Sequence, residues 1–224
     1  MAPTFDALRQ GSDDRTLIRK IQKAIVLLRV GAALPLPTTL FTATNELVDF
    51  KADGWLPAGM ITPDGIEYGR DVSEEDVPAL GYSGPVRADV TEVARSVSFS
   101  PLEYGRKHML ELAYGTDLSQ IKQTLANGEI VFDEPEMPVN QEYQMLIIGV
   151  DGPALNQWVL GRAYGAVKMS STDNQTWGST DPVTTPITLK VLTDAVTGAP
   201  LRHFIGGTGA KAAKTTLGFA QATA

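Results

Sequence analysis

The sequence predicts a mainly β protein with one flanking α-helix, which is an α+β fold. Several stretches of strand length are apolar throughout or alternate apolar with polar residues. One stretch, residues 101–114, combines a helix start signal with apolar residues at helical spacing. Gly and Pro residues separate these stretches. We expect one domain, residues 23–208, between an N-terminal arm, residues 1–22, and a C-terminal tail, residues 209–224.

Composition narrows the class of protein. The 224 residues are 43% hydrophobic and 20% charged, which suffices for one sizeable core. Cysteine is absent, which excludes a disulfide framework, a zinc–thiolate site and cysteine catalysis. The most apolar stretch, Ala24–Val30, is far shorter than the ~20 residues that span a bilayer. It follows no signal-peptide pattern, so we expect a soluble protein made inside the cell without a leader.

The net charge of −7 is distributed unevenly along the chain. Residues 1–39 hold six bases and three acids, residues 40–85 two bases and nine acids, and residues 86–224 eleven bases and fourteen acids, which gives +3, −7 and −3. An acidic chain is a poor candidate for tight nucleic-acid binding, because phosphate contacts need clustered Lys and Arg. Neighbouring segments of opposite sign favour self-association, although an acidic block is more often a solvated loop.

The N-terminal arm leads into a predicted strand that begins near Lys23. Residues 25–30 are rich in Ile, Val and Leu and end at Gly31, which is typical of a strand. The alternative is an amphipathic helix over residues 14–29, because the apolar residues there are also at helical spacing. Periodicity leaves both interpretations open.

A long connection, residues 40–85, follows this strand. Loops of this length are commonly functional or disordered, and its aliphatic and aromatic residues argue against disorder. Thr62–Gly65 is a turn signal, which predicts a hairpin arm. Apolar residues on such an arm need a covering surface, either in their own domain or in a neighbouring subunit. We expect contacts with a neighbouring subunit or ring from Trp55, Met60, Ile61, Ile66 and Tyr68.

Residues 86–99 predict a strand that changes face. Its apolar residues fall on even positions up to Val90 and on odd positions from Val93 onward. This change of parity predicts a bulge or break near Thr91–Glu92, with two short strands joined by a turn as the alternative.

The predicted helix follows this strand directly. Ser100 has N-cap chemistry, Pro101 suits the first helical position, and Glu103 completes a capping box. Met109 and Leu112 belong to the apolar face behind this start. Gly115 is the expected end of the helix.

The remaining chain predicts mainly strands. A second short helix is expected after Asp117, with Leu118, Ile121 and Leu125 on one face. Small residues in the strand after residue 158, such as Gly161, allow another layer to approach closely. The expected strands are residues 143–150, 158–169, 187–191 and 201–205.

The sequence carries no recognisable catalytic, cofactor-binding or metal-binding motif, so we do not expect an enzyme or a cofactor. His108 and His203 fall in unrelated elements, which favours structural roles. The acidic runs at residues 74–76 and 133–136 lack the spacing of a calcium loop. Residues 207–212 fit the loose GxGxxA pattern, but no strand or acidic residue follows at the distance that a dinucleotide site needs.

Three segments carry a resemblance to a known family. The segment GWLPAGMITPDGIEYGRDVSEE, residues 54–75, resembles the "W…G.it.dGi" segment of the major tail proteins of long-tailed, non-contractile bacteriophages, especially those that infect actinobacteria. Residues 86–115 and 188–204 are similar to the same family, and the resemblance covers roughly residues 24–205.

The resemblance implies a structural virion protein, the major subunit of a tail tube. In this family a β-sandwich or barrel carries a flanking helix, six copies close into a ring, and stacked rings enclose a channel for the genome. The implied partners are other copies of the chain, the tape measure protein and other tail proteins, and genomic DNA that passes without specific binding. The implied location is the phage tail, after synthesis in the host cytoplasm.

A tube also implies a particular channel wall. Lys and Arg would bind DNA phosphates and arrest passage, whereas an acidic or polar wall repels them. We therefore expect a net-negative lumen, lined by strands from residues 86–99 and 158–191.

Two other classes of function stay open at this point. One is a carbohydrate- or receptor-binding β-sandwich module, with Trp158 and Trp177 as stacking residues. The other is an enzyme with an unrecognised site, which a compact pocket with several titratable groups of perturbed pKa would reveal.

Overall fold

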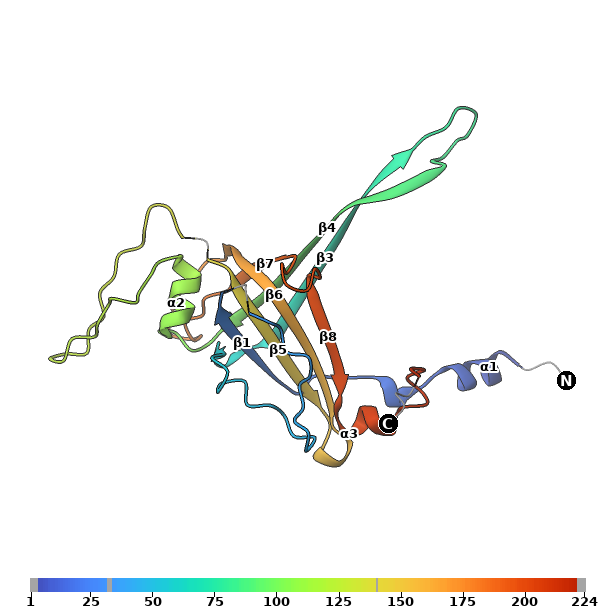
Figure 1. The fold of residues 1–224 in the computed structure, drawn as a ribbon, viewed down its shortest axis with the longest axis horizontal. Coiled ribbons are helices and arrows are strands. Elements are labelled where there is room, and N and C mark those ends of the chain that lie inside the picture. The colour runs from blue at the N-terminus through green and yellow to red at the C-terminus, as the bar shows by residue number, and fades with distance from the viewer. Residues whose placement is uncertain (1–3, 32–33, 140, 221–224) are drawn as a thin grey trace.

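Eight β-strands carry the fold in the computed structural model, which describes residues 4–31, 34–139 and 141–220 (Figure 1). The strands are β1 Lys23–Val30, β2 Leu56–Pro57, β3 Ile61–Val77, β4 Arg87–Pro101, β5 Tyr143–Asp151, β6 Trp158–Thr172, β7 Ile187–Leu192 and β8 Leu201–Gly206. The helices are α1 Phe5–Ser12, α2 Lys107–Tyr114 and α3 Gly207–Ala212, with 3-10 turns at Arg15–Leu17 and Ala154–Asn156.

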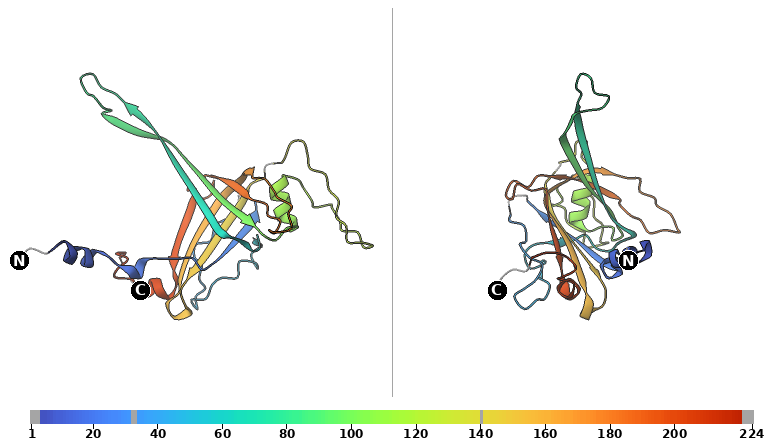
Figure 2. Two further views of the ribbon diagram at one scale, coloured as in Figure 1. Left: turned by 180° about the vertical axis from the view of Figure 1, so that it is seen from behind. Right: turned by 90° about the vertical axis from the view of Figure 1, so that its right-hand side faces the viewer.

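All eight strands join one antiparallel sheet. Seven of them follow the order β2-β1-β5-β6-β7-β4-β3, and β8 pairs with β6 outside this order. Strand β6 is the point where the sheet divides, because β8 pairs with its first half and β7 with its second half. The β3–β4–β7 part thereby folds over the face of β1, β5 and β6 (Figure 2). The prediction of a mainly β fold with a flanking helix is confirmed.

Two apolar layers hold this rolled sheet together. The inner layer lies between β1–β5–β6 and β4–β7, where α2 closes one side, and includes Met145, Val97 and Leu189, each 0% exposed. The outer layer covers the opposite face of β1, β5 and β6 with the connection that follows β1. Trp55, 2% exposed, is the largest side chain in that outer layer. The predicted central strand, β5, is accordingly buried over nearly its whole length.

The flanking helix begins later than predicted. The start signal at Ser100 and Pro101 is wrong, because Pro101 still pairs with Ile61 and ends β4. Glu103 does not close a capping box; its Oε1 accepts from the backbone N–H of Met60 at 2.8 Å, and its Oε2 accepts from Arg106 Nε at 2.6 Å. Glu103 therefore ties the loop between β4 and α2 to the residue before β3, and it does not cap a helix.

The body and the end of α2 agree with the prediction. Met109 and Leu112 are 5% and 2% exposed and face the inner core. Gly115 ends the helix in the left-handed region, with φ of 59°.

Strands β3 and β4 form a long hairpin, and its turn is not where the sequence predicted. Thr62–Gly65 lies inside β3 as an irregularity between the Ile61 and Ile66 pairings, so the turn prediction there is wrong. The chain reverses at residues 78–85, where the N–H of Val86 donates to the carbonyl of Val77 at 3.0 Å. The predicted change of face is confirmed, because pairing shifts between Ser73 and Glu74 and leaves Thr91 of β4 as the extra residue.

Among the other predicted elements, some are confirmed and some are wrong. Residues 23–30 form a strand, so the helical alternative there is wrong. The second helix after Asp117 is also wrong; residues 117–127 form turns in which Leu125 is 104% exposed. The strands after residue 143 are confirmed, and β8 pairs with β6. The expected close approach occurs at Gly161, where an added Cβ would lie 2.6 Å from Leu40 Cδ1.

Candidate assembly surfaces

The β3–β4 hairpin projects from the body as a two-stranded arm (Figures 1 and 2). Strand β7 pairs with β4 only at Ser96–Phe99, so among the described residues the strands beyond that point pair with each other alone. Its distal half displays large apolar side chains, each at least 40% exposed, at Val72, Val77, Leu80, Tyr82, Val86 and Val90. Such a row of uncovered apolar groups marks a contact surface.

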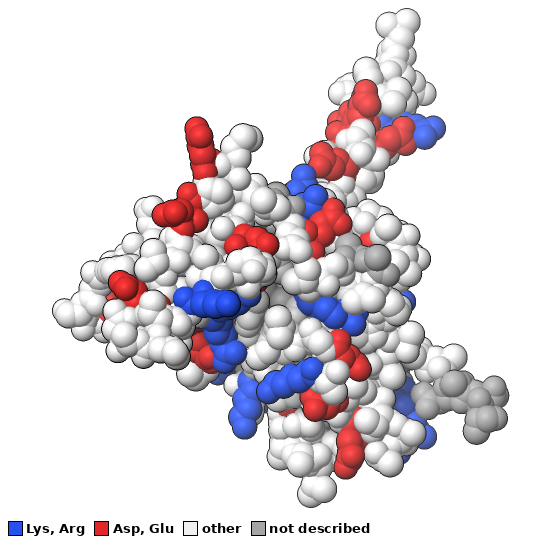
Figure 3. All heavy atoms as spheres, turned by 60° about the vertical axis from the view of Figure 1, so that its left-hand side comes forward, with Lys and Arg blue, Asp and Glu red and all other residues white. Residues whose placement is uncertain are grey.

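The distal half of this arm is also strongly acidic, as Figure 3 shows. Residues 71–92 hold six Asp and Glu against one base, Arg87, a net charge of −5. Two of these acids, Glu75 and Asp89, face each other directly across the hairpin. Like charges opposite each other destabilise a free hairpin, so a basic surface would stabilise it.

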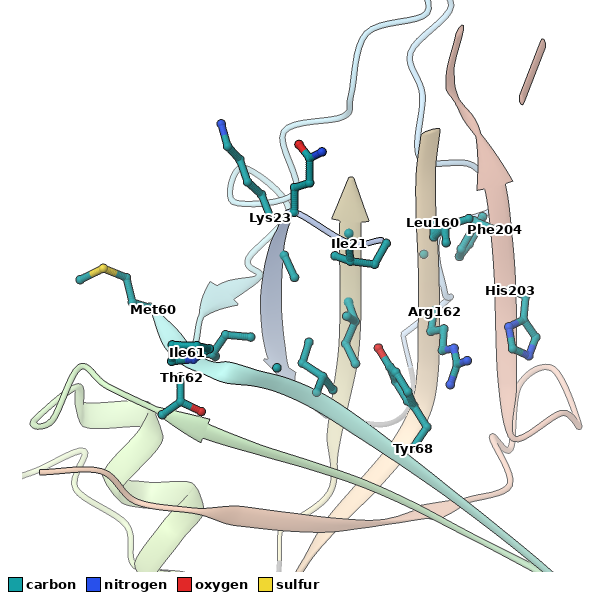
Figure 4. A pocket seen from close by; sticks show the side chains of 18 of the residues that line it. Ile21, Lys23, Met60, Ile61, Thr62, Tyr68, Leu160, Arg162, His203 and Phe204 are labelled. Carbon is teal, nitrogen blue, oxygen red and sulfur yellow. The ribbon is translucent and has the colours of Figure 1, made fainter. Parts of the chain in front are cut away.

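A cleft of about 820 Å³ opens between the root of β3 and the sheet face formed by β1, β5, β6 and β8 (Figure 4). Its walls are mostly apolar. They include Met60, which directly precedes β3, Ile66 of β3, Leu160 of β6 and Phe204 of β8. The charged residues that line it are Lys23 and Arg162, both basic. The cleft is therefore apolar inside and positive at its polar positions.

Tyr68 and Arg162 make one edge of the cleft. The guanidinium carbon of Arg162 lies 3.6 Å from the centroid of the Tyr68 ring, a cation–π contact that ties β3 to β6. Burial raises the pKa of the Tyr68 hydroxyl, and the charge of Arg162 partly opposes this. Burial lowers the pKa of His203 beside them, and Arg162 lowers it further, so His203 is neutral at pH 7.

The N-terminal arm leaves the body next to this cleft. Arg19 pins its last residues, because its guanidinium lies 4.0 Å from the Trp158 ring centroid and 3.4 Å from Asp151 Oδ2. Before that point the arm runs outward, and Phe5 and Leu8 of α1 are 77% and 55% exposed (Figure 1).

A further extended segment, residues 116–139, projects beside α2 (Figure 1). It carries five acids and one base, and its apolar residues Leu125, Val131 and Met137 are at least 67% exposed.

The outer face of β3, β4 and β7 is flat and polar. Ser98 and Thr188 share a hydrogen bond of 2.9 Å across β4 and β7. Register places Glu67 beside Ser98 and Lys190 beside Ser96 on the same face. Asp71 and Glu92 continue this face toward the arm.

The predicted contact residues divide between this chain's own core and the cleft. Trp55 is 2% exposed and is covered by the outer layer of its own chain, with Phe50 against its ring, so it offers little surface to a neighbouring subunit. Ile61 and Ile66 are half-buried against the inner core and also line the cleft. Met60 and Tyr68 are 66% and 41% exposed.

Sequence reasoning did not single out two features of this surface. The tip residues Leu80 and Tyr82 carried a usable signal, since large apolar residues lay among Gly and Pro. The cleft carried none, because its walls come from five separate strands and the N-terminal arm.

The two histidines have structural surroundings. His108 Nε2 is 2.9 Å from the carbonyl oxygen of Pro57, and burial lowers the pKa of this ring. His203 lines the cleft. Within residues 4–31, 34–139 and 141–220, no three His, Asp or Glu side chains gather as metal ligands would. None of the helices in that described part combines the length and hydropathy of a bilayer-crossing helix.

No protein-family model and no curated protein matches the chain. Solved structures with a similar fold include the anti-feeding prophage cap, with 13% identity, a TM-score of 0.40 and coverage of 87% of this chain and 97% of that one. The sheath–tube complex of an extracellular contractile injection system (PVC) has 11% identity, a TM-score of 0.38 and coverage of 88% and 99%. The tail of an empty GTA particle has 10% identity, a TM-score of 0.34 and coverage of 64% and 86%.

These neighbours are components of tails and injection systems. One belongs to a contractile system, whereas the sequence resemblance implied a non-contractile tail. Because each of these TM-scores is below 0.5, the function has to be argued from the residues of this chain.

Proposed function

We propose that the chain is the major subunit of a tail tube, which self-assembles into stacked hexameric rings around a channel for genome passage. One observation carries the proposal: the chain displays large apolar side chains on projecting segments that its own core leaves uncovered. Monomeric proteins rarely expose such surfaces, so other copies or other tail proteins would cover them. The sequence resemblance supplies the ring of six and the non-contractile tail.

The polar outer face of β3, β4 and β7 is the proposed channel wall. It lies opposite the inner core, and its central side chains, Ser98 and Thr188, are small and already bonded to each other. Glu67, Asp71 and Lys190 make it mixed, with acids predominating on the β3 side. Such a wall stays hydrated and weakly repels DNA, whereas clustered Lys and Arg would bind its phosphates.

The proposed contacts with other subunits involve Met60 and Tyr68, with Ile61 and Ile66 behind them in the cleft. Further proposed partners are the tape measure protein and other tail proteins, and genomic DNA held only in transit. The proposed location is the virion, after synthesis in the host cytoplasm. Residues 1–22 and 209–224 are proposed as arms that gain further partners on assembly, although Gly209 and Ala210 of α3 are already buried in the single chain.

A carbohydrate-binding module has lost its main support. Trp158 is 4% exposed and lies beneath Arg19, so its ring is closed to a sugar. Trp177 is 76% exposed but stands in a loop without a second exposed Trp to form a platform among the described residues.

Electron microscopy of the purified full-length protein tests the proposal. Rings with sixfold symmetry that stack into tubes with an open channel are the expected result. Light scattering after size exclusion should show a concentration-dependent shift from monomer to large assemblies. A protein that stays monomeric at every concentration, or assemblies without a through-channel, would overturn it.

A further inference from the structure

We propose that the tip of the β3–β4 hairpin of one copy fills the apolar cleft of a second copy. The tip is defined as residues 77–86, and the cleft is the one between the root of β3 and the β1–β5–β6–β8 face. This inference rests on the proposed self-assembly and deepens it, because it names the two surfaces that join.

The cleft is suited to a macromolecular occupant. It opens to solvent, its volume of about 820 Å³ accommodates several large side chains, and its walls are mostly aliphatic and aromatic. Met60 at its mouth is 66% exposed and Ile205 56%. Covering these groups removes apolar area from water, which drives association.

The tip has complementary chemistry. Leu80 is 103% exposed and Tyr82 72%, at the end of a ribbon whose residues 71–92 carry a net charge of −5. The cleft meets them with apolar walls and with Lys23 and Arg162 as its charged lining. The apolar tip side chains match the apolar walls of the cleft, and the acidic ribbon matches its basic residues. This complementarity favours the contact and speeds the encounter of the two copies.

Two other segments of the chain are weaker occupants. Helix α1 has exposed Phe5 and Leu8, but its Asp6 and Arg9 cancel, so it lacks the matching charge. The segment 116–139 is acidic and apolar, but it is held by turns instead of paired strands. The hairpin is hydrogen-bonded along both strands up to Val77, so less conformational entropy is lost when its tip binds.

The contact must join different copies. Tyr68 lines the cleft and Val77 begins the tip, and both belong to the same extended strand. At about 3.3 Å per residue, the strand carries the tip roughly 30 Å away from its own cleft. A tip-to-cleft contact is therefore head-to-tail between copies, and a repeated head-to-tail contact closes into rings or continues as a helical stack.

Cross-linking tests the pairing directly, because the natural chain has no cysteine. The test variant carries Leu80→Cys and Met60→Cys, and a short bis-maleimide is added to the full-length protein at assembling concentration. A ladder of covalent dimers, trimers and larger species is expected. The matched control carries Leu80→Cys and Val196→Cys, with the second cysteine at the exposed β7–β8 turn, and should give at most a tenth of the ladder.

A third variant, Leu125→Cys with Met60→Cys, tests the rival segment. A ladder from this pair that exceeds the one from Leu80 and Met60 would assign the cleft to residues 116–139 and overturn the proposal. No ladder above the Val196 control, in protein that forms tubes normally, would overturn it while leaving the proposed function intact. If the protein forms no tubes, that function fails, and the ladder in concentrated protein still decides whether tip and cleft meet.

Substitution of the tip gives an independent measurement. Leu80→Ser with Tyr82→Ser should leave the melting temperature of the monomer unchanged, because both side chains are exposed. The concentration needed for assembly should rise at least tenfold. Val196→Ser, at the exposed β7–β8 turn, is the matched control and should change this concentration less than twofold. Equal assembly of the tip variant and the control would contradict the proposal.

Discussion

Asp194 is the buried acid that organises the β7–β8 connection. Its carboxylate is 0% exposed and accepts from the backbone N–H groups of Val196 and Thr197 and from the Thr197 hydroxyl at 2.6 Å. Gly165 of β6 faces it, and an added Cβ there would lie 2.3 Å from Asp194 Cβ. Burial alone would raise the pKa of Asp194, but the donors of Thr197 and Val196 hold it below the usual value. The turn depends on this charge staying ionised.

Replacement of Asp194 should destabilise the fold in a pH-dependent way. Asp194→Asn should lower the free energy of unfolding at pH 7 by about 1–3 kcal/mol, because the N–H groups of Val196 and Thr197 lose their charged acceptor. A depressed folded pKa means that this stabilisation is complete above the unfolded pKa and is lost as pH falls through the folded pKa. Urea unfolding of both proteins at pH 7 and at pH 3 measures this. The difference should be smaller at pH 3; a constant difference would contradict the assigned role.

Ser100 and Met109 separate the predicted helix from the observed one. Ser100→Ala should change the free energy of unfolding by less than ~0.5 kcal/mol, because Ser100 lies within β4, next to its last residue, and caps no helix. Met109→Ala should cost about 2–5 kcal/mol, because Met109 is 5% exposed in the inner core. Chemical denaturation of the two variants measures the contrast. A loss of about 1 kcal/mol from Ser100→Ala would restore the helix start at Pro101.

At the scale of elements, β4 belongs partly to the sheet and partly to the projecting arm, and its two parts differ in burial. Strand β4 is buried at Val97 and Phe99, where it belongs to the sheet, and exposed before the bulge at Thr91, where it belongs to the arm. The bulge lets one continuous strand serve both surfaces, because it turns the apolar side chains from one face to the other. The N-terminal arm lacks such pairing and is held only where Arg19 meets Trp158 and Asp151.

Limited proteolysis should map that anchor. In the monomer, trypsin should cut first after Arg9 and Arg15, because these residues precede the anchor and the Arg9 side chain is 68% exposed. Arg19, with a side chain 21% exposed, should resist longer. Mass spectrometry of a time course gives the order. Arg19→Ala should move protection to later residues, and early protection of Arg9 in a verified monomer would contradict a free arm.

At the scale of the whole molecule, the rolled sheet separates an inner core from a polar outer face. Val97 and Phe99 of β4 and every second residue of β7 enter the core, so the residues between them, among them Ser98 and Thr188, must share the other side. That face is the proposed channel wall, and its charge sets how strongly DNA is held.

Reversal of charge on this wall should convert a passive tube into a DNA-binding one. Glu67→Lys with Asp71→Lys should make tubes retain double-stranded DNA, with retention falling steeply as salt rises because counterions are released on binding. Sedimentation of labelled DNA with assembled tubes measures it, and the natural protein should retain at most a tenth as much at the same salt. Glu134→Lys with Glu136→Lys, in the segment beside α2, is the matched control. Equal retention by both variants would place this face outside the channel.

Local patterns were enough for the strands. Residues 143–150 carry apolar side chains on both faces, and the apolar residues of β7 alternate with polar ones. Both patterns indicate burial, which the neighbouring strands complete. The parity change at Thr91 was readable for the same reason, since one extra residue flips every later side chain.

The other features depend on distant partners, and only the tertiary structure decided them. Ser100, Pro101 and Glu103 carry a valid helix signal, but pairing of Pro101 with Ile61 and the contact of Glu103 with Met60 stabilise the strand instead. Trp55 looks like an uncovered arm residue until the outer face of β1, β5 and β6 supplies its cover. The cleft exists only because the sheet rolls β3 over β6, a contact between residues almost a hundred positions apart, such as Tyr68 and Arg162. Periodicity depends only on residues that are close in sequence, whereas these features depend on contacts between residues that are far apart in sequence and close in space.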